Sequence, residues 1–385
     1  MPGPKTPVTA VLKVGEADLA LAAVDRELAV LAKRTAPNPP LAGAPYPALD
    51  GAHVWRWLIA ALGDLGEVFR VEAIVPTAFG ATCGLVDGAH LVLAMMRPTA
   101  EPPKALRDAF TALAPAPDHA GMTTPARGAS LALQLYWQQK AFPEAFARAR
   151  WILGHAGYWG FRLTDGVPAA EAASLVEGGQ LAEVAGARPT TLARRMGWQL
   201  LWPARRDAHR LLGRLEPEVA ERTELAAETP VLVGTTDRAA AHALVLAAGY
   251  DRAAVVTPPG SGAGAGATLT TPGGGHVDAN RRRLVSVDGR PCTVSRDLAD
   301  AGAVGAELDA MACTGPVLVE GDWSGTGALA RARAARGQAV LQVHDADLWA
   351  KGGALLALWG RRRAPVKLTL ERIAADDCPT GDDGA

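Results

Sequence analysis

Short apolar runs separated by polar turns open the chain. Residues 8–14 (VTAVLKV) and 18–24 (DLALAAV) are joined by the turn 15–17, and Asp25-Arg26 precede a third apolar run at 28–32. Runs of this length that are bounded by turn residues are typical of paired β-strands. The pattern therefore predicts three adjacent strands at the start of the chain.

A helical pattern follows the proline-rich segment APNPPLAGAPYPALD. From His53 to Leu62 the apolar residues Val54, Trp55, Leu58 and Leu62 share one helical face. Asp50 precedes this run and has a side chain suited to capping a helix amino terminus. We expect a capped amphipathic helix over residues 53–62.

The next segments alternate between strand and helix patterns. Residues 71–75 predict a buried strand, and 83–86 with 90–95 predict a hairpin across Asp87-Gly88. Bulky apolar and aromatic residues at helical spacing between Ala129 and Leu163 predict a packed helical layer. Alternation of this kind is typical of α/β proteins.

Two further strand and helix patterns lie on either side of an expected domain boundary near residues 246–252. The first half ends in a strand at 231–234 and a helix at 239–246. The second half begins with a strand at 253–256 and later carries a strand at 316–320 and a small-residue helix at 349–358. We therefore expect domains at 1–248 and 249–365. The polar, acidic residues 366–385 predict a disordered tail.

Composition narrows the class of protein. With 385 residues, 49% hydrophobic and 21% charged, the chain is long enough for two domains with separate cores. The 39 Lys and Arg nearly balance the 40 Asp and Glu, so the net charge favours neither nucleic acid nor a membrane surface as a partner. The first residues lack the apolar core of a signal peptide, and we expect a cytoplasmic protein.

Cysteine and histidine spacing bears on metal chemistry. The four cysteines stand far apart, without the close pairing of a zinc site or the density of a disulfide scaffold. The eight histidines are dispersed and form no metal-binding pair with a carboxylate. We expect no dedicated metal cage built from these side chains.

The segment from Pro230 to His242 (PVLVGTTDRAAAH) carries the clearest candidate for chemistry. A short apolar strand ends in a small polar turn, which presents the carboxylate of Asp237. A carboxylate at a solvent-reachable strand end can serve as a general base. It can equally cap the helix expected to begin at Arg238, and the sequence leaves both roles open.

Together with VLKVGEADLALAAVD, YWGFRLTDG, LARRMGW and LLGRLEPEVAERTEL, this segment resembles the FGGY family of sugar kinases. The likeness is greatest to rhamnulose, rhamnose and fuculose kinases. It covers residues 8–250 and is thin from 251 to about 360, where it rests on VLVEG and KGGALLAL. The resemblance implies an α/β, two-domain actin-like ATPase (ribonuclease H-like) fold with a shortened second domain, in which sugar and ATP meet between the domains.

The resemblance also assigns roles by position. It implies that Asp237 takes the proton of the attacking sugar hydroxyl, with ATP and Mg²⁺ as cofactors. It places sugar contacts at Gly80, Gln134 and Glu171, and nucleotide contacts at Gly15, Gly260, Gly262, Gly321 and Gly353. The run GSGAGAG around Gly260 is compatible with a low-complexity linker as well.

Several positions depart from the family pattern. Lys13 stands where the family has a magnesium-binding aspartate, and Ala17 where it has a hydroxyl residue. Phe79 replaces a polar residue before Gly80, and an acidic pair falls on Arg97 and Thr99. Two functions therefore stay open: a kinase that phosphorylates a deoxy sugar or keto-sugar, or a catalytically impaired paralogue that binds sugar, nucleotide or a kinase partner. A homo-oligomer is a further expectation.

Overall fold

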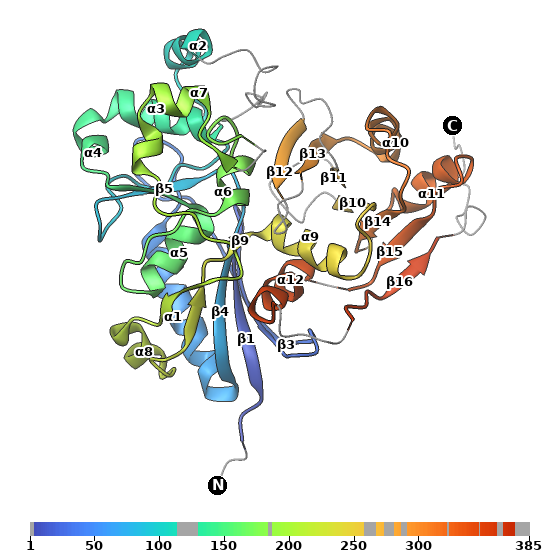
Figure 1. Ribbon diagram of the computed structural model, residues 1–385, viewed down its shortest axis with the longest axis horizontal. Helices are drawn as coiled ribbons and strands as arrows, with labels where there is room; N and C mark the ends of the chain where they lie inside the picture. The colour runs from blue at the N-terminus through green and yellow to red at the C-terminus, as the bar shows by residue number, and fades with distance from the viewer. Residues whose placement is uncertain are drawn as a thin grey trace.

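The computed structural model describes residues 4–113, 130–183, 187–257, 267–272, 281–285, 291–321, 323–345, 347–359 and 365–373. Gly260 and Gly262 lie outside these described residues. Figure 1 shows two lobes, each built on a β-sheet, with helices α9 (Asp237–Ala247) and α12 (Leu348–Ala357) between them. The lobes correspond to the first and second halves of the chain.

In the part of the chain that the structure describes, the first lobe contains nine strands, two of them very short, together with most of the helices. Its strands are β1 Pro7–Val14, β2 Asp18–Val24, β3 Val30–Pro37, β4 Arg70–Ala78, β5 Cys83–Val86, β6 Trp151–Gly154, β7 Leu211–Arg214, β8 Pro230–Leu232 and β9 Thr235–Thr236. Its helices before α9 are α1 Gly51–Val68, α2 Lys104–Leu113, α3 Leu131–Ala141, α4 Pro143–Ala147, α5 His155–Leu163, α6 Ala172–Glu177, α7 Thr191–Arg195, a 3-10 turn at Trp198–Leu201, and α8 Pro217–Thr223.

The main sheet of this lobe has the order β3-β2-β1-β4-β8-β7, and β9 also pairs with β4. The three opening strands form an antiparallel β-meander, which confirms the prediction of three adjacent strands, while β4 runs parallel to β1. Parallel strands align their carboxyl ends, so β1, β4 and β9 end at one edge of the sheet.

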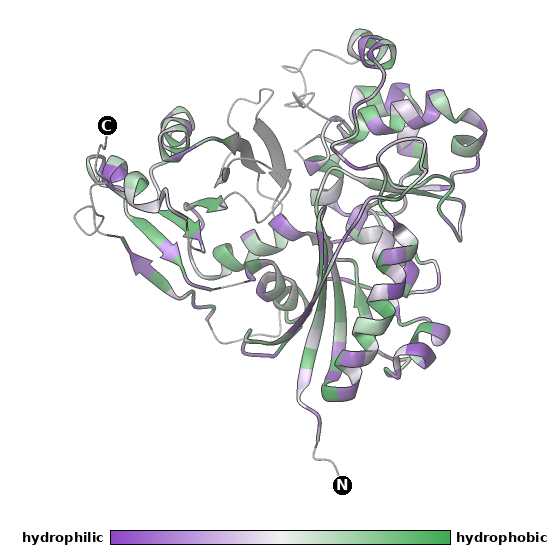
Figure 2. Ribbon diagram, turned by 180° about the vertical axis from the view of Figure 1, so that it is seen from behind, coloured by the Kyte–Doolittle hydropathy of each residue, from purple (hydrophilic) through white to green (hydrophobic). Residues whose placement is uncertain are grey.

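Helix α1 covers one face of this sheet. Its apolar residues Val54, Leu58 and Leu62 are buried, and Asp50 accepts a hydrogen bond from the backbone N–H of His53 at 2.9 Å. The helix is therefore capped as predicted, although it extends to Val68. Figure 2 shows hydrophobic residues along the central strands and a mixture of hydrophobic and hydrophilic residues on the helices around them.

The predicted hairpin over residues 83–95 is confirmed at its turn but not in its second strand. The chain reverses across Asp87-Gly88, with an antiparallel bridge between Val86 and Leu91 and a hydrogen bond from the Val92 N–H to the Leu85 carbonyl at 2.9 Å. Residues 90–95 form no strand, and β5 instead pairs antiparallel with β6. Strand β6 falls inside the segment predicted as a helical layer. A four-residue apolar run has too few positions to distinguish helical from strand periodicity, and tertiary pairing decided the outcome.

The second lobe has its own seven-stranded sheet. Its strands are β10 Ala254–Thr257, β11 Ala267–Pro272, β12 Arg281–Val285, β13 Pro291–Leu298, β14 Val317–Glu320, β15 Val340–Val343 and β16 Leu370–Arg372, and its other helices are α10 Ala301–Ala310 and α11 Thr326–Ala334. The order is β12-β13-β11-β10-β14-β15-β16. Strand β10 pairs antiparallel with β11 and parallel with β14, as β1 does with β2 and β4. The two lobes thus repeat one topology.

Strand β16 lies in the segment predicted as a disordered tail. It pairs antiparallel with β15, and its Leu370 lies opposite Val343. The prediction of a disordered tail is therefore wrong for residues 366–373, because an exposed sheet edge supplies hydrogen-bond partners that the local composition does not reveal. Residues 374–385 lie outside the described part of the chain.

Glycines allow α12 to lie against the first lobe. A Cβ on Gly352 would be 1.9 Å from the carbonyl oxygen of Ala240 in α9, and one on Gly353 would be 2.5 Å from Val11 Cγ1 in β1. Lys33 of β3 also forms an ion pair with Asp347, the residue that precedes α12, at 2.8 Å. The second lobe is therefore attached to the first by direct backbone approach. Across the described residues, we find no helix with the length and apolar character needed to cross a membrane.

Gly234, between β8 and β9, gives the first testable prediction. Its φ is +74°, and a Cβ there would lie 2.0 Å from the carbonyl oxygen of Pro76. We expect Gly234→Ala to lower the free energy of unfolding by roughly 3 kcal/mol, measured by urea denaturation. Gly249→Ala is the matched control, because Gly249 has φ of +88° but no heavy atom within 4 Å. It should cost only about 1 kcal/mol; equal losses would contradict the close-approach argument.

Candidate functional site

The carboxyl ends of strands from both lobes meet near the junction. Lys13 lies near the end of β1 and Asp237 directly follows β9, while Thr257 and Glu320 are the last residues of β10 and β14. The pKa values of Lys13 and Glu320 respond to each other and to Asp237, so these charges from the two lobes lie within electrostatic range. Strand ends of this kind are where ligands bind in α/β sheets.

Asp237 is the first residue of α9. Thr236 provides the cap, since its hydroxyl oxygen accepts a hydrogen bond from the Ala239 N–H at 3.1 Å. The carboxylate of Asp237 accepts a hydrogen bond from the neighbouring Arg238 N–H at 2.8 Å. The structure therefore assigns the capping role to Thr236, and the helix begins one residue earlier than predicted.

Lys13 carries the central positive charge of this region. Its side chain is 13% exposed, and its ammonium group lies 3.3 Å from Asp18 Oδ2. The same ammonium is 5.9 Å from the ring centroid of Trp349 in α12. Burial opposes the charge, but the carboxylates of Asp237, Asp18 and Glu320 outweigh it and raise the pKa of Lys13. Lys13 therefore stays protonated.

The second lobe contributes the carboxyl group of Glu320 to the charged groups at the junction. Thr257 donates a hydrogen bond to its carboxylate at 3.1 Å. Burial raises the pKa of Glu320, while the Thr257 hydrogen bond and the charge of Lys13 act in the opposite direction. This carboxyl group faces the junction from the second lobe, as Asp237 does from the first.

An ion pair between Arg238 and Glu177 lies against Gly80. Arg238 Nη1 is 3.3 Å from Glu177 Oε1, and Glu177 is 1% exposed. A Cβ on Gly80 would be 2.5 Å from Cδ of Glu177. Gly80, a predicted sugar contact, therefore packs on a buried carboxylate whose counter-ion stands beside Asp237.

The contact between Gly80 and Glu177 forms one wall of the site, and Gln134 and Glu171 form hydrogen bonds to the backbone of the segments that build this wall. Gln134 donates a hydrogen bond to the Ala81 carbonyl at 2.7 Å, next to Gly80. Glu171 caps α6 by accepting hydrogen bonds from the N–H groups of Ala173 and Ser174, each at 2.9 Å. Burial raises the pKa of Glu171, and these hydrogen bonds act against the rise. Both residues, predicted as sugar contacts, are buried. Gln134 supports the segment that includes Gly80, and Glu171 supports α6, whose last residue Glu177 packs on Gly80.

The β1–β2 turn is closed by its own polar contacts. Gly15 donates its N–H to the Asp18 carbonyl at 2.8 Å, and a Cβ on Gly15 would be 2.2 Å from Asp18 Oδ1. Glu16 is buried, accepts a hydrogen bond from the Thr99 hydroxyl at 3.1 Å, and lies 3.8 Å from Arg97 Nε. The acidic side chain of this turn is thus neutralised inside the first lobe.

The remaining predicted nucleotide contacts separate in space. Gly321 follows β14 with φ of +65° and has open space where a side chain would lie. Gly353 instead faces Val11 of β1, inside the contact between α12 and the first sheet. Of these two glycines, Gly321 is the one that leaves room for a ligand.

Sequence reasoning missed three contributors to the site. Glu177 and Glu320 were not singled out because each became significant only through a partner distant in sequence, Arg238 and Lys13 respectively. His155, at the start of α5, stacks edge-to-face on Phe79 with ring centroids 4.6 Å apart. Burial lowers the pKa of His155 to about 3. Its position at the strand-to-helix junction GHAGYW was the available signal.

Magnesium binding by the protein does not fit these residues. The position implied to supply a metal ligand carries the ammonium of Lys13, which donates hydrogen bonds and repels cations. Within the described ranges, no group of three or more His, Cys, Asp or Glu side chains is arranged to hold a metal ion. The carboxylates of Asp18, Asp237 and Glu320 already interact with the positive charge of Lys13.

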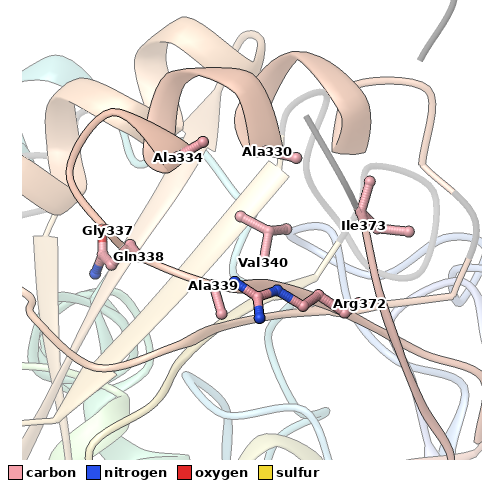
Figure 3. Close-up of a pocket in the computed structure, with 8 residues that line it drawn as sticks. All are labelled: Ala330, Ala334, Gly337, Gln338, Ala339, Val340, Arg372 and Ile373. Atoms are coloured by element: carbon pink, nitrogen blue, oxygen red, sulfur yellow. The ribbon is translucent and has the colours of Figure 1, made fainter. Parts of the chain in front are cut away.

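A separate hollow of about 330 Å³ lies at the other end of the second sheet. Figure 3 shows its lining by α11, the segment before β15, and the end of β16, with Arg372 and Ile373 among its walls. Val340 begins β15, whereas Glu320 lies opposite Val343 at the far end of that strand. This hollow is therefore distinct from the junction between the lobes.

Comparison with solved structures confirms the predicted actin-like ATPase fold of sugar kinases. The chain is similar to a carbohydrate kinase from Novosphingobium aromaticivorans, with 21% identity, coverage of 96% of this chain and 94% of that chain, and a TM-score of 0.83. A xylulose kinase from Rhodospirillum rubrum matches with 15% identity, 96% and 94% coverage, and a TM-score of 0.78. A Plasmodium falciparum glycerol kinase with ADP matches with 11% identity, 92% and 90% coverage, and a TM-score of 0.75.

These likenesses establish the fold alone. No protein-family model and no curated protein sequence matches the chain. The residues at the junction therefore have to carry any argument about activity.

His155 gives the second testable prediction. Because its pKa is lowered to about 3, the native state does not bind the proton that unfolded histidine binds below about 6.5. Its contribution to stability is thus present above pH 6.5 and lost as the pH falls toward 3, by roughly 1.4 kcal/mol per pH unit. His155→Phe should make the fall in unfolding free energy over this window shallower by up to that amount.

Denaturant titrations at several pH values measure this slope. His90→Gln is the control, since it removes an exposed histidine. If the wild-type chain and His155→Phe lose stability in parallel below pH 6.5, the buried neutral histidine is not the cause.

Proposed function

We propose that this chain is an ATP-dependent carbohydrate kinase in which Asp237 is the general base. The observation that carries the proposal is the position of Asp237 at the start of α9, within electrostatic range of Lys13 and Glu320 at the junction of the lobes. The likeness to solved carbohydrate, xylulose and glycerol kinases supports it. The nucleotide binds on the side of Gly321 and the sugar on the side of Gly80.

The reaction moves one phosphoryl group and one proton. The sugar hydroxyl oxygen forms a bond to the γ-phosphorus of ATP as the bond from that phosphorus to the β,γ-bridging oxygen breaks, and ADP leaves. Asp237 accepts the hydroxyl proton, which requires its carboxylate to reach that oxygen at about 3 Å. Thr236 supports this role because its hydroxyl caps α9, so the Asp237 carboxylate is not needed as the helix cap.

The acceptor in this proposal is a deoxy sugar or keto-sugar of the rhamnulose or fuculose type. Phe79 stands beside Gly80 and packs on His155, so this part of the wall offers an apolar ring. An apolar ring favours the methyl group of a deoxy sugar over a hydroxyl, which would lose its hydrogen bonds there. Gln134 and Glu171 position the wall through the backbone contacts described above.

A second candidate function is binding of sugar, nucleotide or a kinase partner without phosphoryl transfer. The ion pair of Arg238 with Glu177 favours it, because this pair lies between Gly80 and Asp237, where a sugar hydroxyl would approach the base. Removal of electrostatic groups from a phosphoryl-transfer site commonly costs a few kcal/mol of barrier each. Under this function the chain binds its ligand but releases no ADP.

The third testable prediction separates the two functions. ADP release is measured with MgATP and a panel of deoxy and keto sugars, and nucleotide binding by the shift in thermal midpoint. We expect sugar-dependent ADP release by the wild-type chain and a fall of about 10²–10⁴-fold in Asp237→Asn, with the nucleotide-induced shift retained.

Asp300→Asn is the matched control for a helix-terminal aspartate. Asp300 caps α10 in the second lobe by accepting a hydrogen bond from the Ala303 N–H at 2.8 Å. An equal loss of turnover in both variants would contradict the assignment of Asp237 as the general base. A nucleotide shift without ADP release from any sugar would select the second function, and the absence of both would contradict both functions.

A further inference from the structure

The Lys13 ammonium is paired with Asp18 and lies 5.9 Å from the ring centroid of Trp349 in α12. Asp18 begins β2 and lies 3.3 Å from the Lys13 ammonium, Asp237 begins α9, and Glu320 ends β14 in the second lobe. All three raise the pKa of Lys13 despite its burial. Its ammonium group is therefore a shared counter-ion between the two lobes.

The other cation of this region is already engaged. Arg238 directs Nη1 to Glu177 at 3.3 Å, and Glu177 is a buried carboxylate in the first lobe. Arg238 also lowers the pKa of Glu320, but it is a smaller influence there than Lys13. Lys13 is thus the larger positive influence on Glu320, and it is also the cation that pairs with Asp18.

The surroundings of Lys13 suit an ammonium ion held in place. The Trp349 ring of α12 lies 5.9 Å from the Lys13 nitrogen, and this ring is fixed by a hydrogen bond from its Nε1 to Asp347 Oδ1 at 3.2 Å. Aromatic faces attract cations at about this separation. A divalent cation at the same point would face the ammonium at short range.

We propose that the ammonium of Lys13 is the resident cation of this junction and takes the place of a protein-bound divalent metal ion. The inference deepens the proposed function by naming the cation of the same site. Phosphate groups of a nucleotide that enter the junction meet the Lys13 ammonium as their protein-supplied positive charge. Removal of the ammonium takes away the charge that repels a divalent cation from Asp18, Asp237 and Glu320, whose oxygen atoms are of the kind that such cations prefer. In the described residues these carboxylates are not already arranged as a metal site, so the side chains have to move toward the ion.

The test is metal binding, which does not depend on turnover. Mn²⁺ is titrated into the wild-type chain, Lys13→Met and Lys13→Asp, and free Mn²⁺ is followed by electron paramagnetic resonance, with circular dichroism to verify folding. Methionine keeps the length of the side chain without its charge, and aspartate adds a fourth carboxylate. We expect both variants to bind one Mn²⁺ at least about tenfold more tightly than the wild-type chain.

Lys33→Met is the matched control. Lys33 also forms an ion pair, with Asp347 at 2.8 Å, but this pair does not include Asp237. Lys33→Met should gain no Mn²⁺ site, and Asp237→Asn combined with Lys13→Met should weaken the new one. The proposal is overturned if the wild-type chain binds Mn²⁺ as tightly as the Lys13 variants, if Lys33→Met gains the same site, or if a folded Lys13 variant binds none. Mn²⁺ binding is measured without turnover, so its result does not depend on whether the chain has kinase activity. The proposal about Lys13 and the proposed kinase function can therefore fail independently.

Discussion

The backbone approach of α12 to α9 and β1 is the contact on which the arrangement of this protein depends. Gly352 and Gly353 leave no side chain between these elements, and any Cβ there would collide with Ala240 or Val11. Protein interiors resist such overlaps because they are already close-packed. The contact sets the position of the second sheet and thereby brings Glu320 toward Asp237 and Lys13. Packing and site geometry are thus coupled through two adjacent glycines.

Charge pairing explains how the junction accommodates residues that differ from the sugar-kinase pattern that the sequence resembles. Glu16 has Arg97 and Thr99 as partners, Arg238 has Glu177, and Lys13 has Asp18 with Asp237 and Glu320 in range. Buried charges are costly without partners, so each change of sign requires a matching change elsewhere. The ionisable groups at the junction therefore interact with groups of opposite sign, and the site differs from a set of isolated losses. Lys13 is interpreted as a resident cation because it interacts with Asp18, Asp237 and Glu320.

The comparisons place this charge arrangement on a widely used scaffold. Solved kinases with 11–21% identity share the fold over more than nine-tenths of the chain. Folds of this kind host sites that differ in their polar residues, so function has to be argued from the site. Here Asp237, Thr236 and Gly321 are compatible with phosphoryl transfer, while Lys13 and the Arg238–Glu177 pair alter the electrostatic setting.

Local patterns in the sequence were enough to predict the strands and helices that carry strong signals. The β-meander, the helix capped by Asp50 and the strand that leads to Asp237 follow from periodicity and turn residues, which act over a few neighbouring positions. The two-lobed fold followed from the resemblance. Tertiary contacts alone establish the pairing of β5 with β6, the strand β16, and the hydrogen bonds and packing of Gln134, Glu171 and Gly353. Those outcomes depend on groups far apart in sequence, whose hydrogen bonds, close approaches and charges exist only once the chain has folded.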